Sequence, residues 1–95
     1  MKKMEEFQKL LAKIPKGKVT TYKELGKILK IHPRAVGRLC AANPYPKKYP
    51  CYKVVLSSGE IGNYSGRGGR KRKAQLLKRD GIEIKDGKID LTLYS

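Results

Sequence analysis

The chain has 95 residues, which is enough for one domain, over residues 1–95, with one modest hydrophobic core. Its 23 lysine and arginine residues against 8 acidic residues give a formal net charge of +15, and this charge predicts a polyanionic partner, most commonly nucleic acid. The sequence contains no apolar run long enough to cross a bilayer and no signal-peptide pattern, so we expect a cytoplasmic protein without a membrane partner.

The first predicted element is an amphipathic helix that stops at Pro15. Its apolar positions, spaced at i, i+3, i+4 and i+7, are Phe7, Leu10, Leu11 and Ile14. A second helix is predicted to begin after Thr21, because Thr21 and Glu24 have the spacing of a capping box. We expect this helix to bury Leu25, Ile28 and Leu29.

A third helix is predicted to start near Pro33, with His32 as a cap or surface residue. Its buried positions are expected to be Val36, Leu39 and Cys40. Arg34 and Arg38 project together from a neighbouring face, beside the small residues Ala35 and Gly37, which would let the helix approach a groove closely. The second and third helices therefore form a helix-turn-helix candidate, although the pattern also fits an ordinary helical hairpin with solvated arginines.

The second half of the sequence predicts short strands and one more helix. Prolines after Asn43 enforce an extended loop that leads into Cys51. Further predicted elements are a strand over 54–56, a turn over 57–59, a tight segment over 61–66, a helix over 70–79 that buries Ala74 and Leu77, and a hairpin at Asp86-Gly87 flanked by Ile82, Ile84, Ile89 and Leu91. The basic segment over 67–73 fits either a nucleic-acid patch or the solvated start of that helix.

The two cysteines and the single histidine restrict the possible chemistry. In a reducing cytosol, Cys40 and Cys51 are expected to be free thiols. Neither cysteine nor histidine pairs have zinc-site spacing, so we expect no metal site, and nothing in the sequence indicates a cofactor. The high charge also has a second interpretation, since a lysine-rich surface can simply keep a small protein soluble or heat-tolerant.

Several stretches resemble one known family. They are residues 15–22, 33–37, 43–46, 50–55 and 58–66, read as PKGKVTTY, PRAVG, NPYP, PCYKVV and SGEIGNYSG. In this order and spacing they resemble the C-terminal domain of the O6-alkylguanine-DNA alkyltransferases, suicide repair proteins that move an alkyl group from damaged guanine to a cysteine. The resemblance implies an α+β fold: a small, mainly helical domain with a winged-helix-like helix-turn-helix and short strands.

The resemblance also implies roles for particular residues. Cys51 falls on the alkyl acceptor, Arg34 on the arginine that fills the base stack after guanine is extruded, and Tyr22 on the tyrosine that crowds the 3′ phosphate. Asn43 falls on the hinge between the helix-turn-helix and the active site. The resemblance places Pro46, Tyr64 and Cys40 on the walls of the alkyl pocket, Val54 and Ser65 among the groups that bind the flipped base, and Ala35, Gly37 and Arg38 on the helix that enters the minor groove.

The residues that would activate the cysteine depart from the family pattern. The family usually has histidine directly after the cysteine, coupled to a glutamate on the last helix, whereas this chain has Tyr52 and, at the glutamate position, Asp80. A tyrosine is a poorer base than histidine near neutral pH. One hypothesis is a proton relay from Cys51 through water and Tyr52 to Asp80; the alternative is that Lys53 supplies a positive charge that lowers the thiol pKa.

From these observations we expect a monomeric DNA repair protein that transfers an alkyl group from O6-alkylguanine in double-stranded DNA to Cys51. The alternative is a lesion sensor, similar to the single-domain alkyltransferase-like proteins, which bind the damaged base without transfer and lack the acceptor cysteine. A sequence-specific helix-turn-helix regulator is less consistent with the sequence. Neither a dimerisation element nor Asn or Gln side chains on the third helix are evident.

Overall fold

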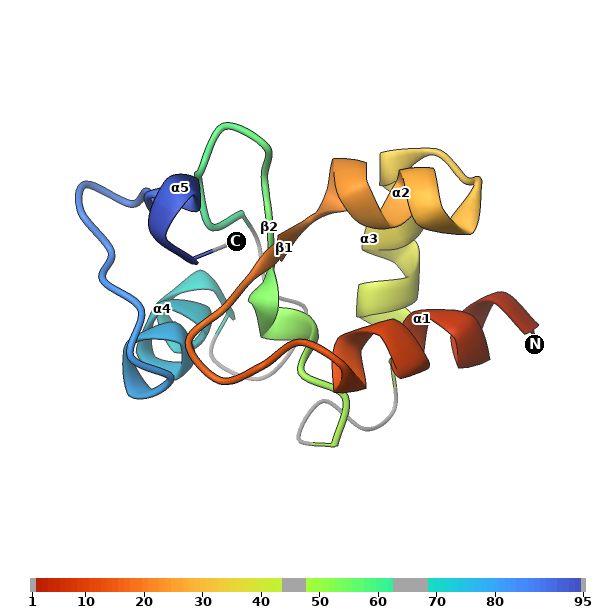
Figure 1. Ribbon diagram of the computed structural model, residues 1–95, viewed down its shortest axis with the longest axis horizontal. Coiled ribbons are helices and arrows are strands. Elements are labelled where there is room, and N and C mark those ends of the chain that lie inside the picture. The colour runs from red at the N-terminus through yellow and green to blue at the C-terminus, as the bar shows by residue number, and fades with distance from the viewer. Residues whose placement is uncertain (1, 44–47, 63–68, 95) are drawn as a thin grey trace.

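Two hydrophobic clusters organise the fold, with a short pair of parallel strands between them (Figure 1). The computed structural model describes residues 2–43, 48–62 and 69–94. Its elements are α1 (Lys2–Ala12), β1 (Thr20–Thr21), α2 (Tyr22–Leu29), α3 (Pro33–Ala42), the 3-10 helix η1 (Cys51–Lys53), β2 (Val54–Val55), α4 (Gly69–Arg79) and α5 (Leu91–Tyr94). This is the small, mainly helical architecture expected from the sequence, but the expectation of one core was wrong.

The first cluster joins α1, α2, α3 and η1, on one side of the strand pair in Figure 1. Its buried side chains are Phe7, Leu11, Leu25, Leu29, Val36, Cys40, Cys51 and Val54. The second cluster joins β2 to α4 and the C-terminal segment on the other side. Its buried side chains are Val19, Val55, Ile61, Leu77, Ile82 and Ile89. Strand β2 thus contributes to both cores, with Val54 in one and Val55 in the other.

The helix-turn-helix has the predicted caps. The Thr21 hydroxyl accepts a hydrogen bond from the Glu24 backbone N–H at 3.0 Å and starts α2, and His32 Nδ1 accepts one from Arg34 N–H at 3.1 Å and starts α3. Gly26 packs against the turn between the helices, since a Cβ there would lie 2.7 Å from the Ile31 carbonyl oxygen. This contact turns the buried face of α2 toward Gly26, so the prediction that Ile28 is buried was wrong: its side chain is 53% exposed.

The strand pair brings distant parts of the chain together in parallel. Thr20 pairs with Val54 and Thr21 with Val55. The predicted extension of the second strand to Leu56 was wrong, because the Leu56 backbone closes a turn instead: its N–H donates to the Glu60 carbonyl and its carbonyl accepts from Gly59 N–H. Since η1 runs directly into β2, this pairing also fixes the position of the turn that carries Cys51.

The C-terminal segment confirms the predicted turn but not a two-stranded hairpin. Asp86 and Gly87 have φ angles of 52° and 74°, as a type I′ turn requires, and Lys85 and Lys88 exchange both backbone hydrogen bonds. Beyond the turn, Ile89 N–H donates to the Gly59 carbonyl instead of continuing the ladder. The chain then forms the unpredicted α5, whose Tyr94 carbonyl accepts from Val19 N–H beside β1. Across the described ranges, no helix is both long and apolar enough to span a bilayer.

Candidate active site and nucleic-acid interface

Cys51 is the first residue of η1, and its position is set by the residues just before it in the chain and by Asn43 at the end of α3. Pro50, with a φ of −75°, precedes the helix, and Cys51 N–H donates to the Tyr49 carbonyl at 2.8 Å. Asn43, the C-terminal cap of α3, donates from Nδ2 to the same carbonyl at 2.9 Å and also hydrogen-bonds to the Cys51 side chain. The end of the helix-turn-helix and the thiol are therefore joined by one buried amide.

The environment of the Cys51 thiol contains opposing effects. Only 4% of the residue is exposed, and this burial raises the pKa of the thiol above its ordinary value because a buried thiolate loses its hydration. The hydrogen bond from Asn43 and the positive charge of Lys73 act in the opposite direction. The arrangement thus excludes water from the sulfur while placing a donor and a cation beside it.

Lys73 was missed by the sequence analysis, which treated its segment as a basic patch or a solvated helix start. Only 1% of this α4 residue is exposed. Its Nζ donates to the Val54 carbonyl at 2.7 Å and to the Tyr22 hydroxyl at 3.5 Å, and it lies 5.6 Å from the centre of the Tyr22 ring. Burial lowers the pKa of the Lys73 amine to about 8. The available signal was the i, i+4 spacing between Lys73 and the buried Leu77.

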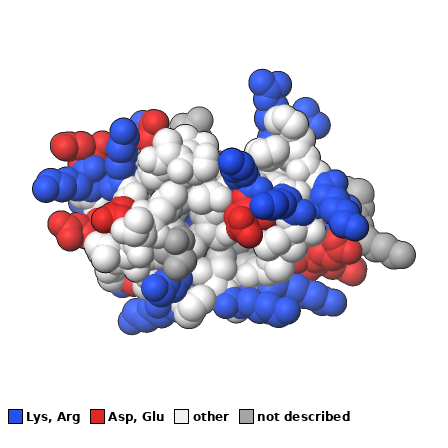
Figure 2. Space-filling model, turned by 45° about the horizontal axis from the view of Figure 1, so that its top comes forward, with Lys and Arg blue, Asp and Glu red and all other residues white. Residues whose placement is uncertain are grey.

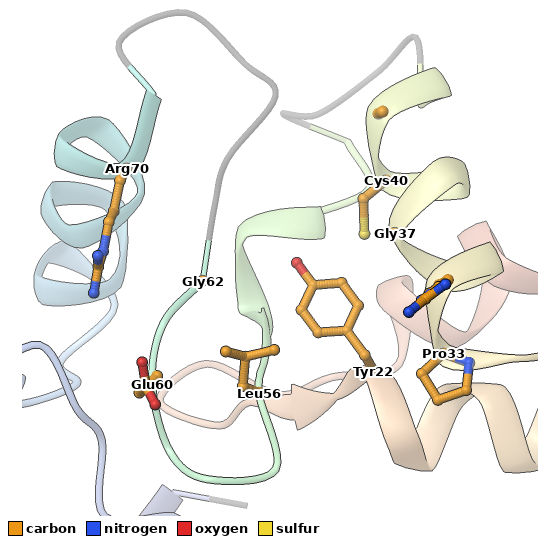
Figure 3. Close-up of a pocket in the computed structure, with 10 residues that line it drawn as sticks. Tyr22, Pro33, Gly37, Cys40, Leu56, Glu60, Gly62 and Arg70 are labelled. Atoms are coloured by element: carbon orange, nitrogen blue, oxygen red, sulfur yellow. The ribbon is translucent and has the colours of Figure 1, made fainter.

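An open pocket of about 640 Å³ lies between α3 on one side and residues 56–62 with Arg70 on the other (Figure 3). The size is within the usual range for a binding site of a small molecule or a base. Figure 3 shows the Tyr22 phenol and the Cys40 sulfur on its α3 side, with Gly62 and Arg70 opposite. Its lining residues are Tyr22, Pro33, Arg34, Gly37, Cys40, Ala41, Leu56, Glu60, Gly62 and Arg70.

Tyr22 and Cys40 are both neutral lining groups. Burial, followed by the charges of Cys40 and Cys51 when ionised, raises the pKa of Tyr22 to about 12. Burial and then the charge of Cys51 raise the pKa of Cys40 to about 12. Because Lys73 contacts Tyr22 and influences both thiols, these four side chains form one cluster beside the pocket.

The outer face of α3 has the character of a groove-binding surface. Arg34 and Arg38 are exposed, Ala35 is half-buried, and both Arg34 and Gly37 line the pocket. A Cβ at Gly37 would meet nothing within 4 Å, so the glycine leaves open space in front of the helix. Figure 2 shows Lys and Arg side chains projecting from several sides of one face of the molecule, which suits a polyanionic partner.

Tyr52 and Asp80, the residues predicted to activate Cys51, lie in different surroundings. Tyr52 is half-buried and packs against the second hydrophobic cluster. Asp80 Oδ2 accepts a hydrogen bond from Gly17 N–H at 2.8 Å and lies 3.1 Å from Lys53 Nζ. The structure therefore brings Asp80 together with Lys53, and the positive charge beside the thiol is that of Lys73. The relay through Tyr52 stays a prediction.

The remaining predicted residues divide into two groups. Val54, which was expected to be among the groups that bind the flipped base, is fully buried in β2, and its carbonyl accepts the hydrogen bond from Lys73. Pro46, Tyr64 and Ser65 lie outside the described residues.

Comparison with known proteins gives one consistent result. Residues 3–82 match the family model described as "6-O-methylguanine DNA methyltransferase, DNA binding domain". The chain is 44% identical over 87 residues to a bifunctional methyltransferase/endonuclease of Picrophilus torridus, covering 90% of this chain and 28% of the relative. It is 43% identical over 77 residues to a methylated-DNA–protein-cysteine methyltransferase of Thermococcus barophilus, covering 81% of this chain and 42% of the relative. The chain thus spans less than half the length of these relatives.

Among solved structures, the fold is similar to that of S. pombe Atl1 in complex with damaged DNA containing O6-carboxymethylguanine. The TM-score is 0.83 at 26% sequence identity, and the match covers 98% of this chain and 93% of Atl1.

Proposed function

The chain belongs to the family of 6-O-methylguanine DNA methyltransferase DNA-binding domains, and from this premise we propose that it transfers an alkyl group from O6-alkylguanine in double-stranded DNA to Cys51. The observation that carries the proposal is the setting of the thiol. Cys51 is buried, hydrogen-bonded by Asn43 at the end of the helix-turn-helix, and lies near the Lys73 charge. A merely structural cysteine does not need a buried cation beside it.

The first step is extrusion of the damaged base. A base inside a duplex cannot reach a buried thiol, and flipping it out costs a few kcal/mol. In the proposed mechanism, α3 lies in the groove with Gly37 closest to the DNA, and Arg34 occupies the gap in the base stack with its planar guanidinium. The extruded guanine then enters the pocket lined by Tyr22 and Cys40.

The second step is a direct displacement. The Cys51 thiolate attacks the alkyl carbon, the S–C bond forms, and the C–O6 bond breaks with its electron pair going to the guanine oxygen. The purine then takes up one proton and becomes ordinary guanine. The thioether that remains on Cys51 has no leaving group, so each protein molecule reacts once.

Formation of the thiolate requires a proton acceptor, and Lys73 has the appropriate properties. With a pKa of about 8, about a tenth of the Lys73 amines are neutral at pH 7. A neutral amine can take the thiol proton, and the resulting ammonium then stabilises the thiolate, which offsets the cost of burial. Entry of a base into the pocket would strengthen this attraction further because it removes water from the cluster.

Intact-protein mass spectrometry tests the proposal directly. The protein is incubated with a duplex that contains O6-methylguanine, beside a Cys51→Ala control and a duplex with ordinary guanine. We expect one added methyl group per chain, and peptide mapping should place it on Cys51 and not on Cys40. An unchanged mass of the wild-type protein after prolonged incubation would refute alkyl transfer.

A second candidate function is lesion binding without transfer. Two observations favour it: the match to Atl1 extends over nearly the whole length of both chains, and burial raises the pKa of the Cys51 thiol. This function predicts a preference for O6-alkylguanine duplexes over undamaged DNA, with no change in protein mass. In either case we expect a monomer on the DNA, which analytical ultracentrifugation of the complex would measure.

A further inference from the structure

A buried ion pair lies two residues from the acceptor cysteine. Lys53, the last residue of η1, places its Nζ 3.1 Å from Asp80 Oδ2 at the end of α4. The Lys53 side chain is 5% exposed and that of Asp80 is 11% exposed. A buried pair of this kind contributes little net stability, but removal of one partner leaves an uncompensated charge in the interior.

The same two charges hold a third segment, the loop after α1. Lys53 Nζ donates to the Pro15 carbonyl at 3.1 Å, and Asp80 Oδ2 accepts from Gly17 N–H at 2.8 Å. Gly17 has a φ of 81°, a conformation that glycine adopts without strain. The first loop, η1 and the end of α4 therefore meet at one point, and η1 is fixed at the end opposite to Cys51.

We propose that Lys53 and Asp80 form a positioning clamp that holds η1, and with it the Cys51 sulfur, in the geometry needed for attack on the alkyl carbon. This inference rests on the proposed alkyl transfer. It gives the carboxylate a different role from that of a proton relay: Asp80 neutralises Lys53 and orders the turn, while the cation beside the thiol is Lys73.

The reason that such a clamp affects the rate is geometric. An in-line displacement requires the sulfur, the alkyl carbon and O6 to be nearly collinear, and a misplacement of about 1 Å can slow a reaction about a hundredfold. Within the turn, Cys51 N–H donates to the Tyr49 carbonyl and Lys53 N–H donates to the Pro50 carbonyl over short spans. Asn43 of α3 adds hydrogen bonds to the Tyr49 carbonyl and to the Cys51 side chain. The ion pair and hydrogen bonds of the Lys53 and Asp80 side chains connect the end of this turn to α4 and to the first loop.

The test compares Asp80→Asn with Asp86→Asn, which removes the same charge at an exposed turn where Asn tolerates the positive φ. We expect Asp80→Asn to slow single-turnover transfer at saturating lesion duplex by about tenfold to a hundredfold. The lesion-DNA Kd should stay within about twofold of wild type, and the midpoint of the pH–rate profile should not move. Asp86→Asn should match the wild-type protein in all three measurements.

A double variant separates the clamp from a relay. Lys53→Gln combined with Asp80→Asn removes the unpaired buried charge and keeps two hydrogen-bonding side chains, so it should recover part of the rate lost in Asp80→Asn. In a relay the carboxylate itself is required, so the double variant would stay as slow as Asp80→Asn. That result, a shifted pH midpoint, or an unchanged rate in folded Asp80→Asn would each overturn the proposal. If circular dichroism shows that Asp80→Asn is unfolded, the double variant is compared directly with wild type. A higher midpoint of the pH–rate profile in the double variant would again indicate a relay.

Amide hydrogen exchange distinguishes failure of the clamp from failure of the proposed function. If the wild-type protein transfers no alkyl group, the proposed function fails, but the clamp still predicts faster exchange at the Cys51 and Lys53 amides in Asp80→Asn and unchanged exchange in Asp86→Asn. Unchanged exchange at those amides in Asp80→Asn would overturn the clamp whether or not transfer occurs.

Discussion

Replacement of Gly37 by alanine should stabilise the protein and weaken its binding to DNA. Gly37 lies in the interior of α3, where glycine costs about 0.8–1 kcal/mol relative to alanine. The added Cβ would meet no atom within 4 Å, so nothing opposes this gain, and the melting temperature should rise by about 4–8 °C for each kcal/mol. If α3 lies against the minor groove of DNA, the same methyl group contacts the DNA, and the free energy of binding to the lesion duplex should become less favourable by about 1–3 kcal/mol.

The matched control is Gly26→Ala in α2. The new Cβ there would lie 2.7 Å from the Ile31 carbonyl oxygen, so this variant should be destabilised although it has the same gain in helix propensity. Calorimetry gives the melting temperatures, and fluorescence anisotropy with an O6-methylguanine duplex gives the affinities. A destabilised Gly37→Ala would contradict the open space in front of α3, and wild-type affinity in this variant would refute close approach of α3 to DNA.

Three other predictions concern charge. Raising the pH from 8 to 9 should increase the free energy of unfolding of wild type relative to Lys73→Met by about 1 kcal/mol, measured by chemical denaturation. The Lys73 pKa is about 8 in the fold and 10.5 when unfolded, so the unfolded state binds more protons in this pH range. The same free-energy difference at both pH values would contradict a buried amine. Arg34→Lys should weaken lesion-duplex binding about tenfold, since an ammonium cannot fill a base stack; equal anisotropy curves would exclude that role. Affinity for any duplex should fall steeply with salt, and titrations at about 50 and 200 mM that agree within about twofold would exclude phosphate contacts as the main source of binding.

Local signals in the sequence were sufficient to predict the helix-turn-helix. Thr21 and His32 are caps because their side chains reach backbone N–H groups only two or three residues away, so the sequence spacing alone determines the contact. The prediction for Ile28 was wrong for a non-local reason. The buried face of α2 depends on how closely Gly26 approaches the turn after the helix, and periodicity does not contain that distance.

The thiol site was only partly predictable. The motifs single out Cys51 and Asn43, but the cation near the sulfur, Lys73, comes from α4, which lies farther along the chain. Lys73 was missed because it stands in a run of basic residues, and its i, i+4 spacing from Leu77 was the one local sign that it is buried. The pairing of Lys53 with Asp80 was equally inaccessible, because it depends on where two turns meet in space.

The parallel pairing of β1 with β2 has a consequence for the order of folding. Thr20 pairs with Val54, so the strands join only after a long loop closes, whereas α2 and α3 are neighbours in sequence. Local helical contacts generally form faster than non-local strand pairing. We therefore expect the helix-turn-helix to form first and η1, which continues into β2, to be completed later. A newly made chain would then present its DNA-binding helices before Cys51 is buried, and during that interval the Cys51 thiol is exposed to oxidants.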